Sequence, residues 1–171
     1  LLYLDASNLY GWAMSQPLPT NYFRWEELPN ATMQDPSGLS SFQLEKGRGY
    51  VFEVDLCYTE VAKQLTYKFP VAPENKKPEQ EEFSYYQQSI IEEEGTKTVT
   101  NKLILDLHNK ERYVVHYRLL QYYLKLGLRV TKIHRIISFK EEAWLAKYIK
   151  FNTDERTKSK SAFEKDLWKL M

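Results

Sequence analysis

The sequence predicts an α+β fold, in which strands and helices follow one another without regular alternation. Short runs with apolar residues at every second position indicate strands, and longer segments with apolar residues three or four positions apart indicate helices. Apolar residues make up 43% of the 171 residues, which is enough for one globular domain with a core. No run approaches the roughly eighteen continuous apolar residues of a membrane span.

The chain opens with a predicted strand and a short predicted helix. Residues 1–4 form an apolar run that ends on the carboxylate of Asp5. Residues 9–14 are expected to begin a helix, which Pro17 and Pro19 stop.

An irregular segment and a strand are predicted next. Residues 20–28 are aromatic and predicted to be irregular, and residues 30–49 are predicted to form a loop. Residues 50–56 alternate with period two and predict a strand. Glu53 and Asp55 share one face of that strand, where exposure to solvent is expected.

The middle of the chain mixes short elements with a less structured segment. Residues 60–68 predict a short helix, and residues 102–107 and 113–117 predict two short strands. Residues 70–95 contain Pro73, Pro78 and two acidic runs, and they predict a surface insertion that is helical in part.

The last third predicts helix, strand and helix again. Residues 118–126 have a broad apolar face, and Gly127 is placed to end that helix. Residues 130–139 predict a strand. Residues 141–171 predict a helical region in two pieces, with the break near residues 152–154.

The charge of the chain is unevenly distributed. Residues 110–171 contain 15 Lys/Arg and 7 Asp/Glu, a net of +8, whereas residues 1–109 carry a net of −7. This asymmetry indicates that the C-terminal third faces a polyanion. Solvated helix faces explain the charge alone equally well.

The numbers and positions of cysteine and histidine limit the compartments and the kinds of site that the sequence predicts. The single Cys57 fits a reducing compartment, nucleus or cytoplasm, and disfavours secretion. The three histidines are too far apart in sequence to predict a zinc site, and there is no glycine-rich phosphate loop. Because the chain lacks an initiator Met, opens inside a strand and stops inside a helical pattern, we expect a fragment of a longer protein.

The segment from Asp5 to Tyr10 suggests metal-dependent chemistry. A carboxylate at the tip of a strand supplies half of the ligands that a two-metal nucleotidyl-transfer site needs. An aromatic ring five residues later can pack beneath a sugar and clash with a 2′-hydroxyl. An Asp that simply caps the following turn is the simpler interpretation of Asp5 alone.

A row of lysines near the C-terminus suggests phosphate binding. Lys158, Lys165 and Lys169 have spacings that predict one face of a helix, and an apolar row predicts an opposite face packed on a core (Phe163, Leu167 and Leu170). Such a row suits triphosphate oxygens. By pattern alone, an ordinary amphipathic helix with solvated lysines is favoured.

The segment Leu2–Met14, with Asp5, Asn8-Leu9-Tyr10 and Gly11, resembles the first polymerase motif of the protein-primed branch of family B DNA polymerases. The likeness extends along the chain and is greatest to the transposon and virus-like group. Further segments carry it: residues 16–19, 49–56, 113–118, 126–135 and 163–171.

The resemblance implies a partial polymerase palm with an insertion and the start of the fingers. Residues 1–16 would hold the first palm segment, and residues 17–140 the palm continuation and an insertion for the terminal protein and DNA. Residues 141–171 would form the first helices of the fingers. The implied reaction is two-metal addition of deoxynucleotides to a protein primer on a DNA template.

The resemblance also implies roles for seven residues. Asp5 would hold Mg²⁺ with its carboxylate, and Ala6 would do so with its carbonyl. Nucleotide contacts would come from both ends of the chain, with Tyr10 as the steric gate against ribonucleotides (Ala6, Asn8, Leu9, Tyr10, Lys165 and Lys169).

The chain also departs from the family pattern. Gly11 stands where cellular enzymes usually have Pro, the second motif is cut off after Met171, and the third motif with the second metal-binding Asp is absent. We therefore expect the isolated chain to be inactive. One alternative is a non-catalytic DNA- or protein-binding module derived from a mobile-element polymerase. Another is an unrelated α+β domain in which Asp5 and Lys169 lie far apart.

Overall fold

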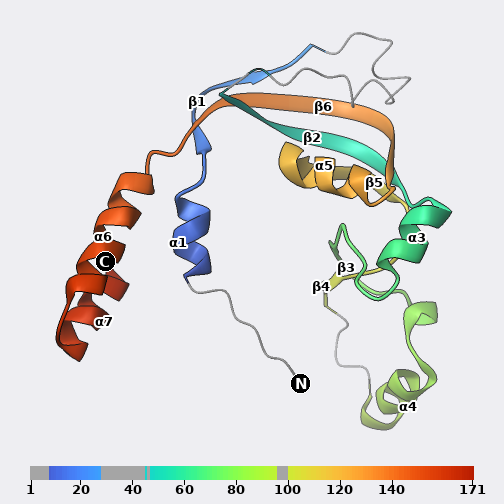
Figure 1. Ribbon diagram of the computed structural model, residues 1–171. Helices are drawn as coiled ribbons and strands as arrows, with labels where there is room; N and C mark the ends of the chain where they lie inside the picture. Colours follow the sequence, from blue (N-terminus) through green and yellow to red (C-terminus); the bar gives the residue numbers. More distant parts are fainter. Residues whose placement is uncertain (1–7, 28–44, 46, 96–99) are drawn as a thin grey trace. The chain divides into compact units, whose positions relative to one another are not determined.

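The computed structural model describes residues 8–27, 45, 47–95 and 100–171, and the chain divides into two compact units. Its helices and antiparallel strands confirm the α+β prediction (Figure 1). The strand predicted at residues 1–4, the candidate ligands Asp5 and Ala6, and most of the loop predicted at 30–49 lie outside the described residues. The predicted division into palm, insertion and fingers stays a prediction.

The first unit comprises residues 1–26, 43–50 and 137–171. Its described elements follow one another as short helix, strands and a helical hairpin: α1 (Leu9–Met14), β1 (Leu18–Trp25), the start of β2 (Arg48–Cys57), the end of β6 (Arg129–Glu142), α6 (Ala146–Lys158) and α7 (Ala162–Leu170). The helix predicted at residues 9–14 is confirmed as α1.

Strand β1 contradicts the irregular structure predicted for residues 20–28. It pairs antiparallel with β6, with Leu18 opposite Glu142 and Trp25 opposite Ile137. The pairing has two register shifts, and β1 is an edge strand in the order β1-β6-β2-β5. An edge strand tolerates Pro19, because a proline there need not donate a ladder hydrogen bond. Pro19 and the exposed aromatic side chains interrupt the alternation of apolar and polar residues that predicts a strand.

The helical region at the C-terminus is broken later than the sequence predicts. Helix α6 runs through residues 152–154, and the buried Asn152 lies inside it. The break comes at residues 159–161, where Ser161 caps α7 by accepting the Glu164 N–H while the Glu164 side chain accepts the Ser161 N–H. This reciprocal cap is a strong signal for the start of a helix. A single polar residue inside a helical pattern is a weaker signal for the end of one.

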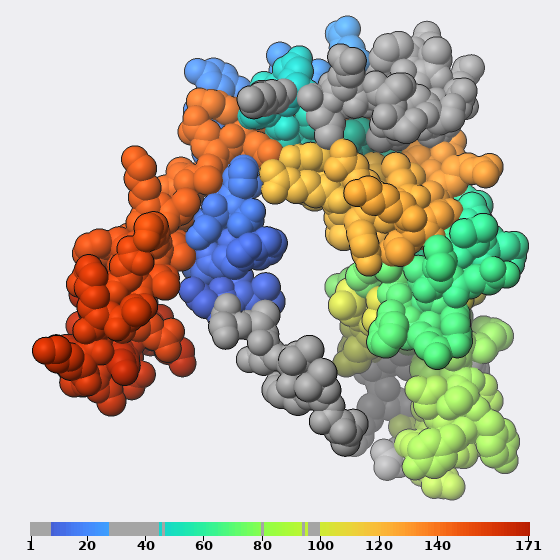
Figure 2. Space-filling model, in the orientation of Figure 1, coloured from blue at the N-terminus to red at the C-terminus, as the bar shows by residue number. Residues whose placement is uncertain are grey.

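The later break also changes the predicted lysine row. Lys158 belongs to α6, whereas Lys165 and Lys169 belong to α7, so the three do not share one helix face. The expected apolar anchor was wrong as well: Phe163 is 77% exposed and Leu170 is 87% exposed. In the space-filling view, the side chains of α6 and α7 form one continuous body (Figure 2).

The second unit comprises residues 27–42 and 51–136. Besides most of β2 and β6, its described elements are α3 (Glu60–Thr66), β3 (Glu74–Lys76), the 3₁₀ turn η2 (Gln80–Glu82), α4 (Tyr85–Glu94), β4 (Lys102–Ile104), β5 (Lys110–His116) and α5 (Tyr117–Lys125). Elements β3, η2 and α4 show that the segment predicted to be least structured, residues 70–95, carries short regular structure.

The core of the second unit lies between one face of β2, β5 and β6 and helix α5. The strand predicted at residues 50–56 is confirmed, and Phe52, Val54 and Leu56 are each at most 1% exposed. Helix α5 packs Leu120 and Tyr123 into this core and ends before Gly127, whose φ of +92° confirms the predicted helix stop.

The opposite face of β2 carries the two carboxylates, as the alternation predicts. Their predicted exposure was wrong for Glu53, which is 7% exposed. Arginine side chains from β5 and β6 cover it: Arg112 forms an ion pair with it at 2.8 Å, and the Arg135 Nε–H donates to it. Charged partners on neighbouring strands therefore bury a carboxylate on a face that sequence alternation marks as polar.

Candidate functional site

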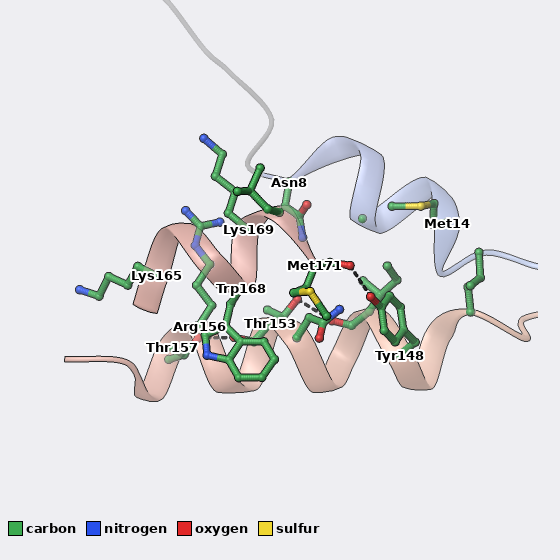
Figure 3. Close-up of a pocket in the computed structure, with 15 residues that line it drawn as sticks. Asn8, Met14, Tyr148, Thr153, Arg156, Thr157, Lys165, Trp168, Lys169 and Met171 are labelled. Carbon is green, nitrogen blue, oxygen red and sulfur yellow. Dashed lines mark hydrogen bonds between the residues drawn. The ribbon is translucent and has the colours of Figure 1, made fainter. Parts of the chain in front are cut away.

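A pocket of about 590 Å³ lies within the first unit, where α1 meets the hairpin of α6 and α7 (Figure 3). Its size falls within the range of small-molecule sites. Residues from all three helices and the C-terminus line it: Asn8, Gly11, Met14, Leu145, Tyr148, Ile149, Asn152, Thr153, Arg156, Thr157, Lys165, Trp168, Lys169, Leu170 and Met171.

Three cations line the same side of this pocket, which we call the basic end: Arg156, Lys165 and Lys169, of which the two lysine side chains extend outward from the pocket (Figure 3). Among the residues that the structure describes, the lining contains no Asp or Glu. Within the described ranges, none of the three forms an ion pair. Their donors are therefore available to an anion, and three such groups together attract a multiply charged one.

The other end of the pocket is aromatic and apolar. Met14 from α1 and Tyr148 from α6 lie there (Figure 3), and the Tyr148 hydroxyl donates to the Met171 carbonyl. Trp168 lines the pocket nearer to Arg156 than to Tyr148 (Figure 3), and its ring makes an edge-to-face contact with Phe151, with ring centroids 5.8 Å apart. A ligand with a phosphate group at one end and a flat or apolar group at the other matches this arrangement.

Asn8 reaches the pocket because of an unusual backbone conformation. It precedes α1 with φ of +55°, in the left-handed region that Asn adopts more readily than most residues. Its side chain lies over Gly11: a Cβ at Gly11 would come 2.4 Å from the Asn8 amide nitrogen. Because Gly11 has no side chain, the Asn8 side chain can occupy this space.

The pocket brings together three of the seven residues predicted from sequence, Asn8, Lys165 and Lys169. Leu9 and Tyr10 do not line it, and their side chains are 56% and 84% exposed. Asp5 and Ala6 lie outside the described residues, so the expected metal site stays a prediction. Arg156 was not predicted from the sequence: it lies on α6 and lines the same pocket as Lys169 because α6 and α7 form a hairpin.

A separate charged cluster in the second unit surrounds the buried Lys110. Glu82, Asp106 and His108 offer ligand atoms within 4.8 Å of one another. Asp106 already accepts from the Lys110 ammonium and pairs with Lys76 at 2.9 Å. The Lys76 ammonium bridges Asp106 and Glu82, where a metal ion would have to bind, so we interpret the cluster as ion pairing.

Comparisons with protein-family models, with curated proteins and with solved structures found no match to the chain. No helix in the part of the chain that the structure describes is long and apolar enough to cross a membrane.

Proposed function

We propose that the chain is part of a protein-primed DNA polymerase of family B, and that the pocket of α1, α6 and α7 binds an incoming deoxynucleoside triphosphate. The basic end would take the triphosphate, and the aromatic end would take the sugar and base. DNA and a terminal protein primer would be the partners of the whole enzyme.

One observation carries this proposal: Asn8, from the segment that resembles the first polymerase motif, lines the same pocket as Lys165 and Lys169. These residues are more than 150 positions apart in sequence. The proposal assigns the first motif and the lysines to one ligand, and a shared pocket is what that assignment requires.

Mg²⁺ is part of the proposed function. When bound, Mg²⁺ would polarise the phosphates and neutralise their charge. Its expected ligands, Asp5 and Ala6, lie outside the described residues. The contribution of the described residues is to bind and orient the phosphates.

Nucleotide binding by the isolated chain tests the proposal without requiring activity. We expect saturable binding of a deoxynucleoside triphosphate, which can be followed by calorimetry or by tryptophan fluorescence, to which Trp168 in the pocket wall contributes. The double variant Lys165→Ala/Lys169→Ala should weaken binding at least about tenfold, because charge-assisted contacts to phosphate are lost.

Lys147→Ala is the matched control. Lys147 is exposed on α6 and does not line the pocket, so its loss should change the dissociation constant less than about twofold. Inorganic tripolyphosphate should bind more weakly than the nucleotide if the aromatic end contributes. No binding at millimolar nucleotide, or equal losses in the control and the double variant, would contradict the proposal.

Gly11→Ala provides a second test that separates the pocket from stability. The three atoms nearest the added Cβ all belong to the end of the Asn8 side chain, which can move, so thermal stability should stay the same or rise slightly with the better helix former. The displaced Asn8 should weaken nucleotide binding a few-fold. Unchanged binding, measured beside an unchanged melting temperature, would exclude a role for Asn8.

A further inference from the structure

Asn152 is a buried polar residue in the lining of the pocket. It lies in the middle of α6 and is only 7% exposed. Its carboxamide forms no hydrogen bond with any residue in the described ranges. Buried polar side chains nearly always have a partner, so an unpaired one requires an explanation.

The two threonines that follow along α6 are paired within the helix, unlike Asn152. The Thr153 hydroxyl donates to the Ile149 carbonyl at 2.8 Å, and the Thr157 hydroxyl donates to the Thr153 carbonyl at 2.9 Å. Asn8, the other carboxamide of the lining, is exposed and can bind water. The Asn152 carboxamide is therefore the buried polar group whose donors and acceptor are available to a ligand in the pocket.

Asn152 is an unfavourable residue for the stability of α6. A buried amide without a partner loses its hydrogen bonds to water and gains none in return. Asn is also a poorer helix former than Leu, which has a similar size. An apolar residue would therefore suit the helix better, and the contribution of Asn152 comes from a bound ligand.

Asn152 lies between the two ends of the pocket. Tyr148, Asn152 and Arg156 are four residues apart along α6, and all three line the pocket. Residues at this spacing share one face of a helix and follow one another about 6 Å apart along its axis. Tyr148 and Arg156 lie at opposite ends of the pocket (Figure 3), so the carboxamide lies between the apolar group and the guanidinium.

The order of these three groups matches the order of groups in a deoxynucleotide. With the phosphates at the basic end and the base at the apolar end, the sugar lies in the middle, beside Asn152. The deoxyribose of a nucleoside triphosphate has one free hydroxyl, on its 3′ carbon. A hydroxyl both donates and accepts, and a carboxamide offers a donor and an acceptor.

We propose that Asn152 is a specificity-determining residue of the pocket, and that its carboxamide forms a hydrogen bond with the 3′-hydroxyl of the bound deoxynucleotide. This inference rests on the proposed function, because it requires that the pocket binds a nucleotide. It adds a selectivity to that function: the pocket discriminates against nucleotides that lack the 3′-hydroxyl and would end a growing strand.

A deoxynucleoside triphosphate and its 2′,3′-dideoxy counterpart test the contact, because they differ by this one hydroxyl. By calorimetry, the parent chain should bind the deoxynucleotide about tenfold more tightly than the dideoxynucleotide. In Asn152→Leu, both nucleotides should bind about as weakly as the dideoxynucleotide binds the parent. The tenfold preference should therefore fall below about twofold.

The melting temperature separates a ligand contact from a structural role of Asn152. Leu replaces an unpaired buried amide with an apolar side chain, so Asn152→Leu should melt at the same temperature as the parent or higher. A structural role predicts a lower melting temperature and an equal loss of affinity for both nucleotides. That result would overturn the inference.

Asn21→Leu is the matched control. Asn21 is exposed on β1 of the same unit and does not line the pocket. The same substitution there should leave the affinity for each nucleotide, and the preference between them, within about twofold of the parent.

Three further results would overturn the inference. These are equal binding of the two nucleotides by the parent, a preference that persists in Asn152→Leu, and a loss in Asn152→Leu that depends on which base the nucleotide carries. If Lys165→Ala/Lys169→Ala still weakens binding of the deoxynucleotide, these results refute the role of Asn152 and leave the proposed function standing. No binding of the deoxynucleotide by the parent would refute both.

Discussion

Replacing Lys110 with alanine should destabilise the second unit by about 3 kcal/mol. The Lys110 side chain is fully buried, and its ammonium is bound by Asp106 and, at 2.9 Å, by Glu74. Removing the Lys110 ammonium leaves the carboxylates of Glu74 and Asp106 close together, with less positive charge to balance them. The loss should be measured as the free energy of unfolding in urea.

The pH dependence of that loss gives a second readout. Burial works against the charged Asp106, but the ammonium groups of Lys110 and Lys76 outweigh it and lower its pKa to about 2. A lowered carboxyl pKa contributes stability above the ordinary pKa, and this stability is lost as pH falls from about 4 to about 2. The difference in unfolding free energy between the parent and Lys110→Ala should therefore become smaller as pH falls over this range.

Lys77→Ala is the control for this prediction, because Lys77 is exposed and directly follows β3. Its loss should cost less than about 0.5 kcal/mol. If Lys110→Ala unfolds at the same urea concentration as the parent, the burial and pairing described for Lys110 are wrong. If the difference in unfolding free energy between the parent and Lys110→Ala instead stays constant between pH 4 and pH 2, the ion pair with Asp106 does not account for the loss of stability.

The regular elements of the second unit could be predicted because local pattern and packing agree there. In residues 50–56 the apolar side chains alternate, and the structure buries the same three, Phe52, Val54 and Leu56. Gly127 follows the apolar face of α5 and adopts the positive φ that such a stop requires. At these positions the sequence signal and the tertiary structure have the same physical cause.

The charged residues could not be placed, because their environment comes from distant segments. Lysine and glutamate are expected at the surface, yet Lys110 and Glu53 are 1% and 7% exposed. Most of their partners come from other elements of the second unit: Glu74 of β3 binds Lys110, and Arg112 of β5 and Arg135 of β6 bind Glu53. Asp106, four residues before Lys110, is the local exception among the described partners. Periodicity describes one segment at a time and carries no information about such pairs.

The pocket shows the same limit in a functional setting. The spacing of Lys165 and Lys169 placed both on one helix face, and both line the pocket. Arg156 is thirteen residues before Lys169 and on another helix, so no helical spacing relates them. The Ser161 cap, which ends one helix and starts the next, is the local signal that makes the hairpin and thus the third cation.

Reversing the charge of Arg156 should have the largest effect on nucleotide binding. The described lining combines three cations with no acidic residue, so a carboxylate at position 156 would repel the triphosphate as well as remove a donor. We expect Arg156→Glu to weaken binding of a deoxynucleoside triphosphate about a hundredfold, and Arg156→Ala about tenfold. Both can be measured by calorimetry on the isolated chain.

Lys147→Glu makes the same kind of charge change on the same helix and serves as its control. Lys147 lies nine residues before Arg156, which places it about 13 Å away along the helix axis. At physiological ionic strength this exceeds the screening length of about 8 Å, so its reversal should weaken binding no more than about twofold. Equal losses in the two reversals would mean that only the net charge of the chain attracts the nucleotide. A large loss confined to Arg156→Glu would instead locate the triphosphate at the basic end, beside the lysines that the polymerase resemblance assigns to it.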